Sequence, residues 1–205
     1  TEAECRSIVA EAKKAKAIFG VCHVMRYTRY TRALKNMVME GAIGDIVSLQ
    51  LLEQVGWWHQ AHSFVRGNWR SEKTSSPMLL AKSCHDMDWM RHIMGHKCLR
   101  VSSFGSLKHF RREEAPKGAG SRCLSCPADV EAKCPYSAMR LYLGMIKEGK
   151  LEWPVDVITD DLTESGVTEA LRTGPYGRCV YACDNDVVDN QVVILEFEGG
   201  RTANF

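Results

Sequence analysis

The sequence lacks a long apolar run, an excess of either charge and a secretory signal. No stretch approaches the roughly 20 consecutive apolar residues that a membrane-spanning helix needs. Its 27 basic and 25 acidic residues are interleaved, so no basic stripe is available to bind nucleic acid. The N-terminal stretch is charged, unlike the apolar core of a signal peptide. We therefore expect a cytoplasmic protein with no nucleic-acid partner and no membrane partner.

The chain also lacks a glycine-rich phosphate loop. No Gly-x-Gly-x-x-Gly segment precedes a helix anywhere in the sequence, and such a segment is what cradles a dinucleotide's phosphates in an α/β fold. The chain by itself is therefore not expected to bind a dinucleotide. Its nine cysteines are an odd number spread along 205 residues, which argues against a secreted disulfide scaffold.

The N-terminal residues are typical of one repeat of an α/β sheet. Thr1 and Glu4 form a capping box that starts a helix. An apolar run at 18–24 follows and predicts a strand buried on both faces. Because this pair has no predecessor, we interpret residues 1–25 as the remnant of an N-terminal domain and residues 26–205 as a second domain, truncated at its C-terminus.

The second part predicts an α+β fold, with a largely antiparallel open sheet and helices on one face. Helices are expected at 30–40, 82–94, 135–148 and 160–174, and strands at 46–55, 99–107, 176–183, 187–197 and 201–205. The Glu-Gly-Gly at 198–200 is predicted to be a hairpin turn.

A loop at 56–76 is chemically rich, with Trp57, Trp58, His59, His62, Arg66 and Trp69 among its residues. Aromatic rings stack on the C–H faces of sugars, and Arg and His bond to hydroxyls or carboxylates, so the loop is suited to a polar ligand pocket. A surface loop packed by its tryptophans, or a subunit interface, is the alternative.

Cysteines cluster in a long irregular segment at 108–134. Cys123-x-x-Cys126 is followed by Cys134, and this spacing suits three of the four ligands of a tetrahedral zinc ion. We choose Cys179 as the fourth ligand over Cys183, with His109 a weaker option. An iron–sulfur cluster, a disulfide or free thiols are the other interpretations of the cluster.

Motifs in a particular order cover almost the whole chain. They are Arg26-Tyr27, Gly41-x-Ile43-Gly44-Asp45-Ile46, Asn68-Trp69-Arg70, Cys84-His85-Asp86-Met87-Asp88, Asp189-x-Gln191 and Glu196-Phe197-x-Gly199. Together they resemble the glucose–fructose oxidoreductase/inositol dehydrogenase (Gfo/Idh/MocA) family. Residues 1–24 resemble the last helix and strand of that family's dinucleotide-binding domain, and the rest resembles its second domain.

The resemblance implies hydride transfer between a sugar or polyol and NAD or NADP, in a homo-oligomer formed through the sheet of this domain. His85 matches the family's catalytic histidine, and Lys82 lies beside it. The family has Asp four residues before that histidine, whereas this chain has Ala81, so the proton relay is altered. By order in the chain, His59, Arg66, Trp69 and Trp57 fall nearest the family's substrate cleft.

Two other functions compete with an oxidoreductase. Ala81 also fits a catalytically inactive family member that binds a sugar-like ligand. The cysteine cluster also fits a zinc-stabilised interaction domain.

Overall fold

The structure is a computed structural model that describes residues 1–205. Four strands form one open sheet in the order β1–β4–β3–β2. They are β1 Ser48–Gln50, β2 Cys98–Ser106, β3 Asn190–Phe197 and β4 Arg201–Asn204. The β2–β3 and β3–β4 pairs are antiparallel, and β1 runs parallel to β4. The predicted α+β fold with an open, largely antiparallel sheet is therefore confirmed.

The helices are mostly short. They are α1 Glu2–Lys14, α2 Arg29–Met39, α3 Trp57–His59, α4 Met78–Ala81, α5 Cys84–Met94, α6 Ala128–Glu131, α7 Gly144–Lys147 and α8 Glu164–Thr173. Two π-helical segments, Gln60–Arg66 and Met139–Leu143, continue α3 and precede α7. Single 3-10 turns include Val24–Tyr27, Arg112–Glu114, Cys123–Ser125, Val155–Val157, Pro175–Gly177, Val180–Ala182 and Glu198–Gly200. None of these helices combines the length and the apolar character needed to cross a bilayer.

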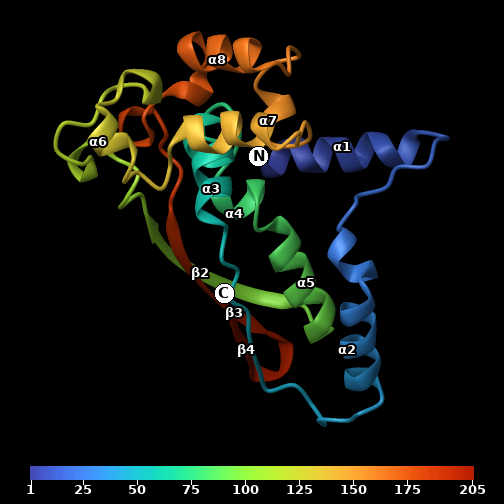
Figure 1. Cartoon of the computed structure of the whole chain (residues 1–205). Coiled ribbons are helices and arrows are strands. Elements are labelled where there is room, and N and C mark those ends of the chain that lie inside the picture. The colour runs from blue at the N-terminus through green and yellow to red at the C-terminus, as the bar shows by residue number, and fades with distance from the viewer.

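One core lies between α5 and the sheet, where α5 and α2 occupy the same side (Figure 1). It is formed by buried Met90 and Met94 of α5 against Val193, Leu195, Phe197 and Ala203 of the sheet. Side chains alternate along β3, so Val192 and Ile194 point away from this core and are exposed. The sheet is thus covered on one face, as the sequence predicts.

A second core holds the helices at the other end of the molecule, around α7 and α8 (Figure 1). Tyr142, Val155, Val167 and Leu171 are each fully buried there. The π-helical segment Gln60–Arg66 is buried throughout and lies beside the turns at Pro175–Gly177 and Val180–Ala182. The cysteine-rich segment therefore rests on a helical scaffold and not on the sheet.

The prediction of a strand at 18–24 is wrong. These residues have no regular structure until Val24, and Ile18, Phe19 and Val21 are exposed. Helix α1 also buries no residue. A strand with two apolar faces is stable only between neighbouring strands and covering helices, and the chain places none of these beside it.

Three other predicted elements differ from the structure. The strand expected at 46–55 forms only at β1, because only β4 lies alongside it. The strand expected at 176–183 is a pair of 3-10 turns, the first of which begins at Pro175. The first half of the loop expected at 56–76 is helical from Trp57 to Arg66. The hairpin turn is confirmed, with Gly199 and Gly200 at φ of +77° and +74°.

Candidate functional site

An open cleft of about 440 Å³ lies where the chain after β1, the start of α3, and β3 meet. Its polar lining comprises Glu53, Gln54, Gln60, Ser83, Asp189, Asn190 and Gln191, and its aromatic lining comprises Trp57, Phe110, Tyr136 and Phe205. The rings of Trp57 and Tyr136 approach edge-on, with centroids 6.2 Å apart. A cleft of this size, with flat aromatic faces and amide groups, suits a small hydroxylated ligand.

Lys82 stands near this cleft but is already paired. Its Nζ lies 2.9 Å from Oε1 of Glu53, which lines the cleft, and 3.9 Å from Oδ2 of Asp86. Burial raises the pKa of Asp86, and the Lys82 ammonium opposes that rise. Lys82 therefore holds two carboxylates near the cleft wall.

His85 occupies the first turn of α5, on a helix that is anchored in the sheet core. Its Nδ1 is buried and has no hydrogen-bond partner in the chain. The ring meets that of His23 edge-on at 5.5 Å. Ligand atoms of His23, Cys84 and His85 lie within 4.8 Å of one another, so this group could hold a metal ion. His85 is not among the residues that line the cleft.

Trp58, His59 and His62 of the predicted loop form an aromatic cluster around Trp153. His59 packs edge-on against Trp153 at 5.0 Å, and His62 stacks on Tyr176 at 4.8 Å. Burial lowers the pKa of His59, and the charge of Lys82 lowers it further. His59 thus belongs to a packed aromatic cluster and lies close enough to Lys82 for the ammonium charge to lower its pKa.

Of the other three residues predicted to bind ligand, one lies in the cleft, one at the surface and one in the interior. Trp57 lines the cleft. Trp69 is 46% exposed and lies outside the cleft lining. Arg66 is 1% exposed; its Nε donates to the carbonyl of Arg178 and its Nη2 to the carbonyl of Tyr136, each at 2.7 Å. The structure therefore places Arg66 in the interior, beside the cysteine segment and away from an open ligand site.

His62 predicts a pH dependence of stability. Its buried Nδ1 lies 2.8 Å from the Tyr142 hydroxyl, and burial lowers the pKa of His62 from 6.5 to about 4. In the unfolded chain His62 is protonated below about pH 6.5, whereas in the folded chain it is protonated only below about pH 4. Above pH 6.5 His62 is neutral in both states and does not lower the free energy of unfolding. As the pH falls from 6.5 to about 4, proton uptake by the unfolded chain lowers the free energy of unfolding by up to about 1.4 kcal/mol per pH unit.

His62→Gln should remove that dependence, because glutamine can keep the bond to Tyr142 and does not titrate. Urea unfolding at about pH 7 and about pH 5 should show the wild type losing roughly 2 kcal/mol more than the variant. Equal losses in the two proteins would contradict this assignment.

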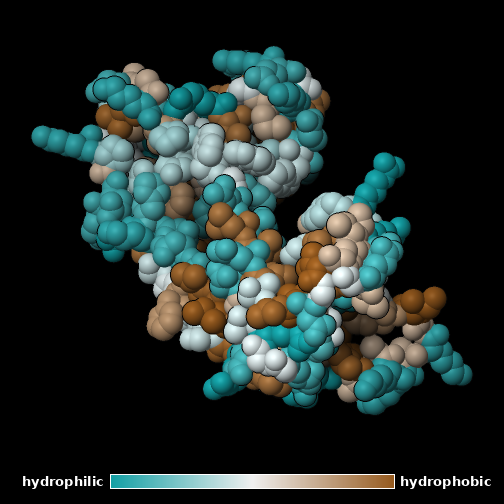
Figure 2. Space-filling view, turned by 90° about the horizontal axis from the view of Figure 1, so that it is seen from below, coloured by the Kyte–Doolittle hydropathy of each residue, from teal (hydrophilic) through white to brown (hydrophobic).

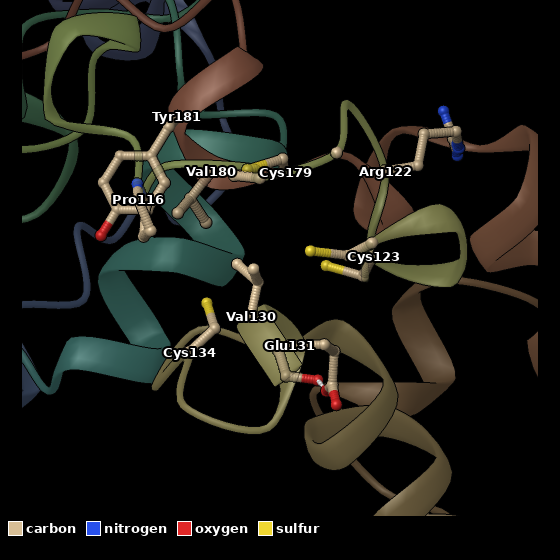
Figure 3. A pocket seen from close by; sticks show the side chains of 13 residues that line it. Pro116, Arg122, Cys123, Val130, Glu131, Cys134, Cys179, Val180 and Tyr181 are labelled. Carbon is tan, nitrogen blue, oxygen red and sulfur yellow. Dashed lines mark hydrogen bonds between the residues drawn. The ribbon is translucent and has the colours of Figure 1, made fainter. Parts of the chain in front are cut away.

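The four cysteines predicted to bind metal line one small cavity of about 20 Å³ (Figure 3). Neither alternative for the fourth ligand lines it. Cys183 donates its thiol to the carbonyl of Cys179, and the His109 Nε2 lies 3.0 Å from the Tyr136 hydroxyl. The structure thus brings Cys123, Cys126 and Cys134 together with Cys179.

The cleft residues that sequence reasoning missed are Glu53, Gln60, Asn190 and Gln191. They come from two parts of the chain, one around 53–60 and the other at 190–191, and each is an ordinary polar residue in its own context. Only the fold brings these two parts to one cleft, so their residue types did not identify them as cleft residues.

Comparison with known proteins identifies the family. Residues 35–205 match the model of the oxidoreductase family, C-terminal alpha/beta domain (Gfo/Idh/MocA). "Putative oxidoreductase YteT" of Bacillus subtilis is 27% identical over an alignment of 205 positions that covers 98% of this chain and 45% of YteT. The 2,7-anhydro-N-acetylneuraminate hydratase of Escherichia coli is 26% identical over 102 residues, which are 50% of this chain and 26% of the hydratase. The chain therefore spans less than half the length of either curated relative.

Among solved structures, a "probable dehydrogenase from Thermotoga maritima" is similar with a TM-score of 0.49 and 17% identity, over 100% of this chain and 38% of that protein. A "putative myo-inositol dehydrogenase from Sinorhizobium meliloti 1021" gives a TM-score of 0.48 and 12% identity, over 97% and 37%. The family model, in contrast, covers well over half of the chain. The chain therefore belongs to the Gfo/Idh/MocA oxidoreductase family, of which it carries the C-terminal α/β domain.

Proposed function

We propose that the protein containing this chain is an NAD(P)-dependent oxidoreductase that transfers hydride to or from a sugar, polyol or related alcohol. In this proposal the chain supplies the substrate cleft. The observation that carries it is the 440 Å³ cleft, which combines aromatic faces with amide and carboxylate groups. Hydroxyl groups need such donors and acceptors, and sugar C–H faces need a flat ring.

Family membership supports the reaction type, since the family is one of oxidoreductases. A sugar-like substrate agrees with the name of the Escherichia coli relative, which describes a derivative of N-acetylneuraminate. The nicotinamide cofactor would be bound by a part of the protein outside these 205 residues, because they contain no glycine-rich phosphate loop.

His85 would hold and move the proton. The bound nicotinamide would exchange the hydride with the substrate carbon. His85 is the residue that we expect to accept the hydroxyl proton, since its Nδ1 has no other partner. Lys82 and Glu53 would position the substrate as an ion pair, and the ring of Trp57 would bind one of its faces. The family's Asp is replaced by Ala81, so no carboxylate orients His85 from that position.

The outer face of the sheet supports a homo-oligomer. Phe104, Val192 and Ile194 are more than half exposed and lie on neighbouring strands. Hydrophobic side chains also appear as brown patches between hydrophilic ones in the view from below (Figure 2). A second copy would bury them. We place the protein in the cytoplasm, where its nine cysteines would stay reduced.

The test is hydride transfer by the full-length protein. With NAD or NADP and a panel of monosaccharides, polyols and sugar acids, at least one alcohol should generate the reduced nicotinamide's absorbance. Trp57→Ala should weaken the affinity for that substrate by about 2- to 10-fold through lost stacking. Trp69→Ala, a matched change outside the cleft, should leave the affinity unchanged.

A catalytically inactive, ligand-binding protein is the second candidate, favoured by Ala81. Tight binding of a sugar without turnover, measured by calorimetry with either cofactor present, would replace the first proposal with this one. Equal effects of the two tryptophan variants would show that the cleft is not where the ligand binds.

A further inference from the structure

We propose that Cys123, Cys126, Cys134 and Cys179 bind one structural zinc ion. The four residues line a single cavity of about 20 Å³. In Figure 3 the sulfur atoms of Cys123, Cys134 and Cys179 point toward the same central space. That volume is close to one water-sized sphere, which suits a single ion.

The backbone holds the four ligands on two facing segments. The turn Cys123–Ser125 closes with a hydrogen bond from the Cys126 N–H to the Cys123 carbonyl at 3.2 Å. The N–H of Cys179 donates to the carbonyl of Ser121 at 2.9 Å, and an isolated bridge pairs Arg122 with Arg178. The Cys179 segment is thereby fixed against the segment that carries the CxxC turn.

The sulfur atoms have to move closer together to bind one ion. No three of them lie within 4.8 Å of one another, whereas zinc–sulfur bonds of about 2.3 Å set sulfur atoms roughly 3.8 Å apart in a tetrahedron. Zinc binding therefore requires the four side chains to gather around the ion.

A buried cation points independently to a negative charge in this place. Arg66 is 1% exposed, its Nη2 lies 3.5 Å from the Cys123 sulfur, and its Nη1 is buried without a partner. No carboxylate lies within 4.0 Å of the guanidinium. A buried charge without a counterion is costly. Four thiolates around Zn²⁺ carry a net charge of −2, so the site would supply the counterion that Arg66 lacks.

Hydrogen bonds to the sulfur atoms suit metal-bound thiolates. The Ala138 N–H also donates to the Cys123 sulfur at 3.5 Å, and outer contacts of this kind orient metal ligands. Zinc binding would order the irregular segment that carries Cys123, Cys126 and Cys134.

Competing donors near the cavity are already engaged. Glu131 lines it, but its carboxylate accepts a hydrogen bond from the Ser137 hydroxyl and pairs with Arg140. An all-sulfur site is left, which favours zinc among the common divalent ions. The site adjoins the cleft, because Tyr136 follows Cys134 by two residues and Arg66 binds its carbonyl. The inference is independent of the reaction that the cleft performs.

The experiment is metal analysis of the full-length protein produced in zinc-supplemented medium, by native mass spectrometry and elemental analysis. We expect one zinc per subunit, lost in Cys126→Ser and in Cys179→Ser and retained in Cys183→Ser. Cys183 is the matched control, because it lies four residues from Cys179 and does not line the cavity. Absence of zinc from the wild type, stoichiometric iron, or full retention of zinc in Cys126→Ser would overturn the proposal.

Cobalt substitution of the wild type tests the site without relying on folded variants. After removal of zinc, Co²⁺ should give the intense sulfur-to-cobalt absorption and the visible bands of a tetrahedral four-thiolate site. A spectrum of one thiolate with two imidazoles would place the metal at His23, Cys84 and His85 and would overturn the assignment to the four cysteines.

Discussion

His85→Ala in the full-length protein is expected to lower kcat by about 10²- to 10⁴-fold, which is the usual contribution of a positioned acid or base. The expectation rests on the free Nδ1 of His85 and on its rigid support. Helix α5, which carries it, is anchored in the sheet core by Met90 and Met94. Steady-state kinetics with the substrate found by screening would measure the effect.

Which kinetic parameters fall in His85→Ala distinguishes a proton-transfer role from a binding role. A proton-transfer role predicts that kcat and kcat/KM fall together. His92→Ala is the matched control, because His92 lies two turns further along the same helix and should leave kcat unchanged. A rise in KM alone for His85→Ala would make His85 a binding residue and leave the base unassigned.

The covered sheet and the longer helices could be predicted from the sequence because their signals are local. Helix α5 keeps a stripe of apolar residues on one side and ends at Gly95, which has a φ of +73°. The β3–β4 hairpin has an alternating strand and a glycine turn. Each pattern predicts its element without knowledge of its neighbours.

The helix Trp57–Arg66 could not be predicted in this way, and the reason is physical. All seven residues of its π-helical part are buried. A helix surrounded by protein on every side has no polar face, so it shows no 3.6-residue period in the sequence. The strand predicted at 18–24 failed for the opposite reason, because its apolar run is suited to a sheet that the chain does not supply.

The candidate site residues could likewise be predicted where their pattern is local and could not where distant segments meet. The CxxC turn is a short-range pattern, and the sequence indicates it plainly. Cys179 is 45 residues beyond Cys134, and only the bridge between Arg122 and Arg178 brings it to the cavity. Arg66 binds the carbonyl groups of two distant segments, which the sequence does not show. Its residue type alone therefore suggested contact with a ligand, and its burial does not support that contact.

Arg66→Met is expected to destabilise the protein by roughly 2–5 kcal/mol. The substitution removes the Arg66 donors from the carbonyls of Tyr136 and Arg178, which leaves the Arg178 carbonyl only the distant Cys123 thiol. Removing one partner of a buried charged network commonly costs this much. Arg172→Met is the control. Arg172 is 65% exposed in its pair with Glu169, so its loss should change the free energy of unfolding by less than about 0.5 kcal/mol.

Repeating the unfolding measurement with and without zinc separates two roles of Arg66. With zinc bound, the guanidinium balances the charge of four thiolates, and its loss removes both that attraction and its hydrogen bonds. Without zinc that attraction is absent, and loss of the buried cation relieves part of its own desolvation cost. The variant should therefore be more damaging in the zinc-bound protein, by about 1–3 kcal/mol. An equal loss in both states would mean that Arg66 supports the fold through its carbonyl contacts alone.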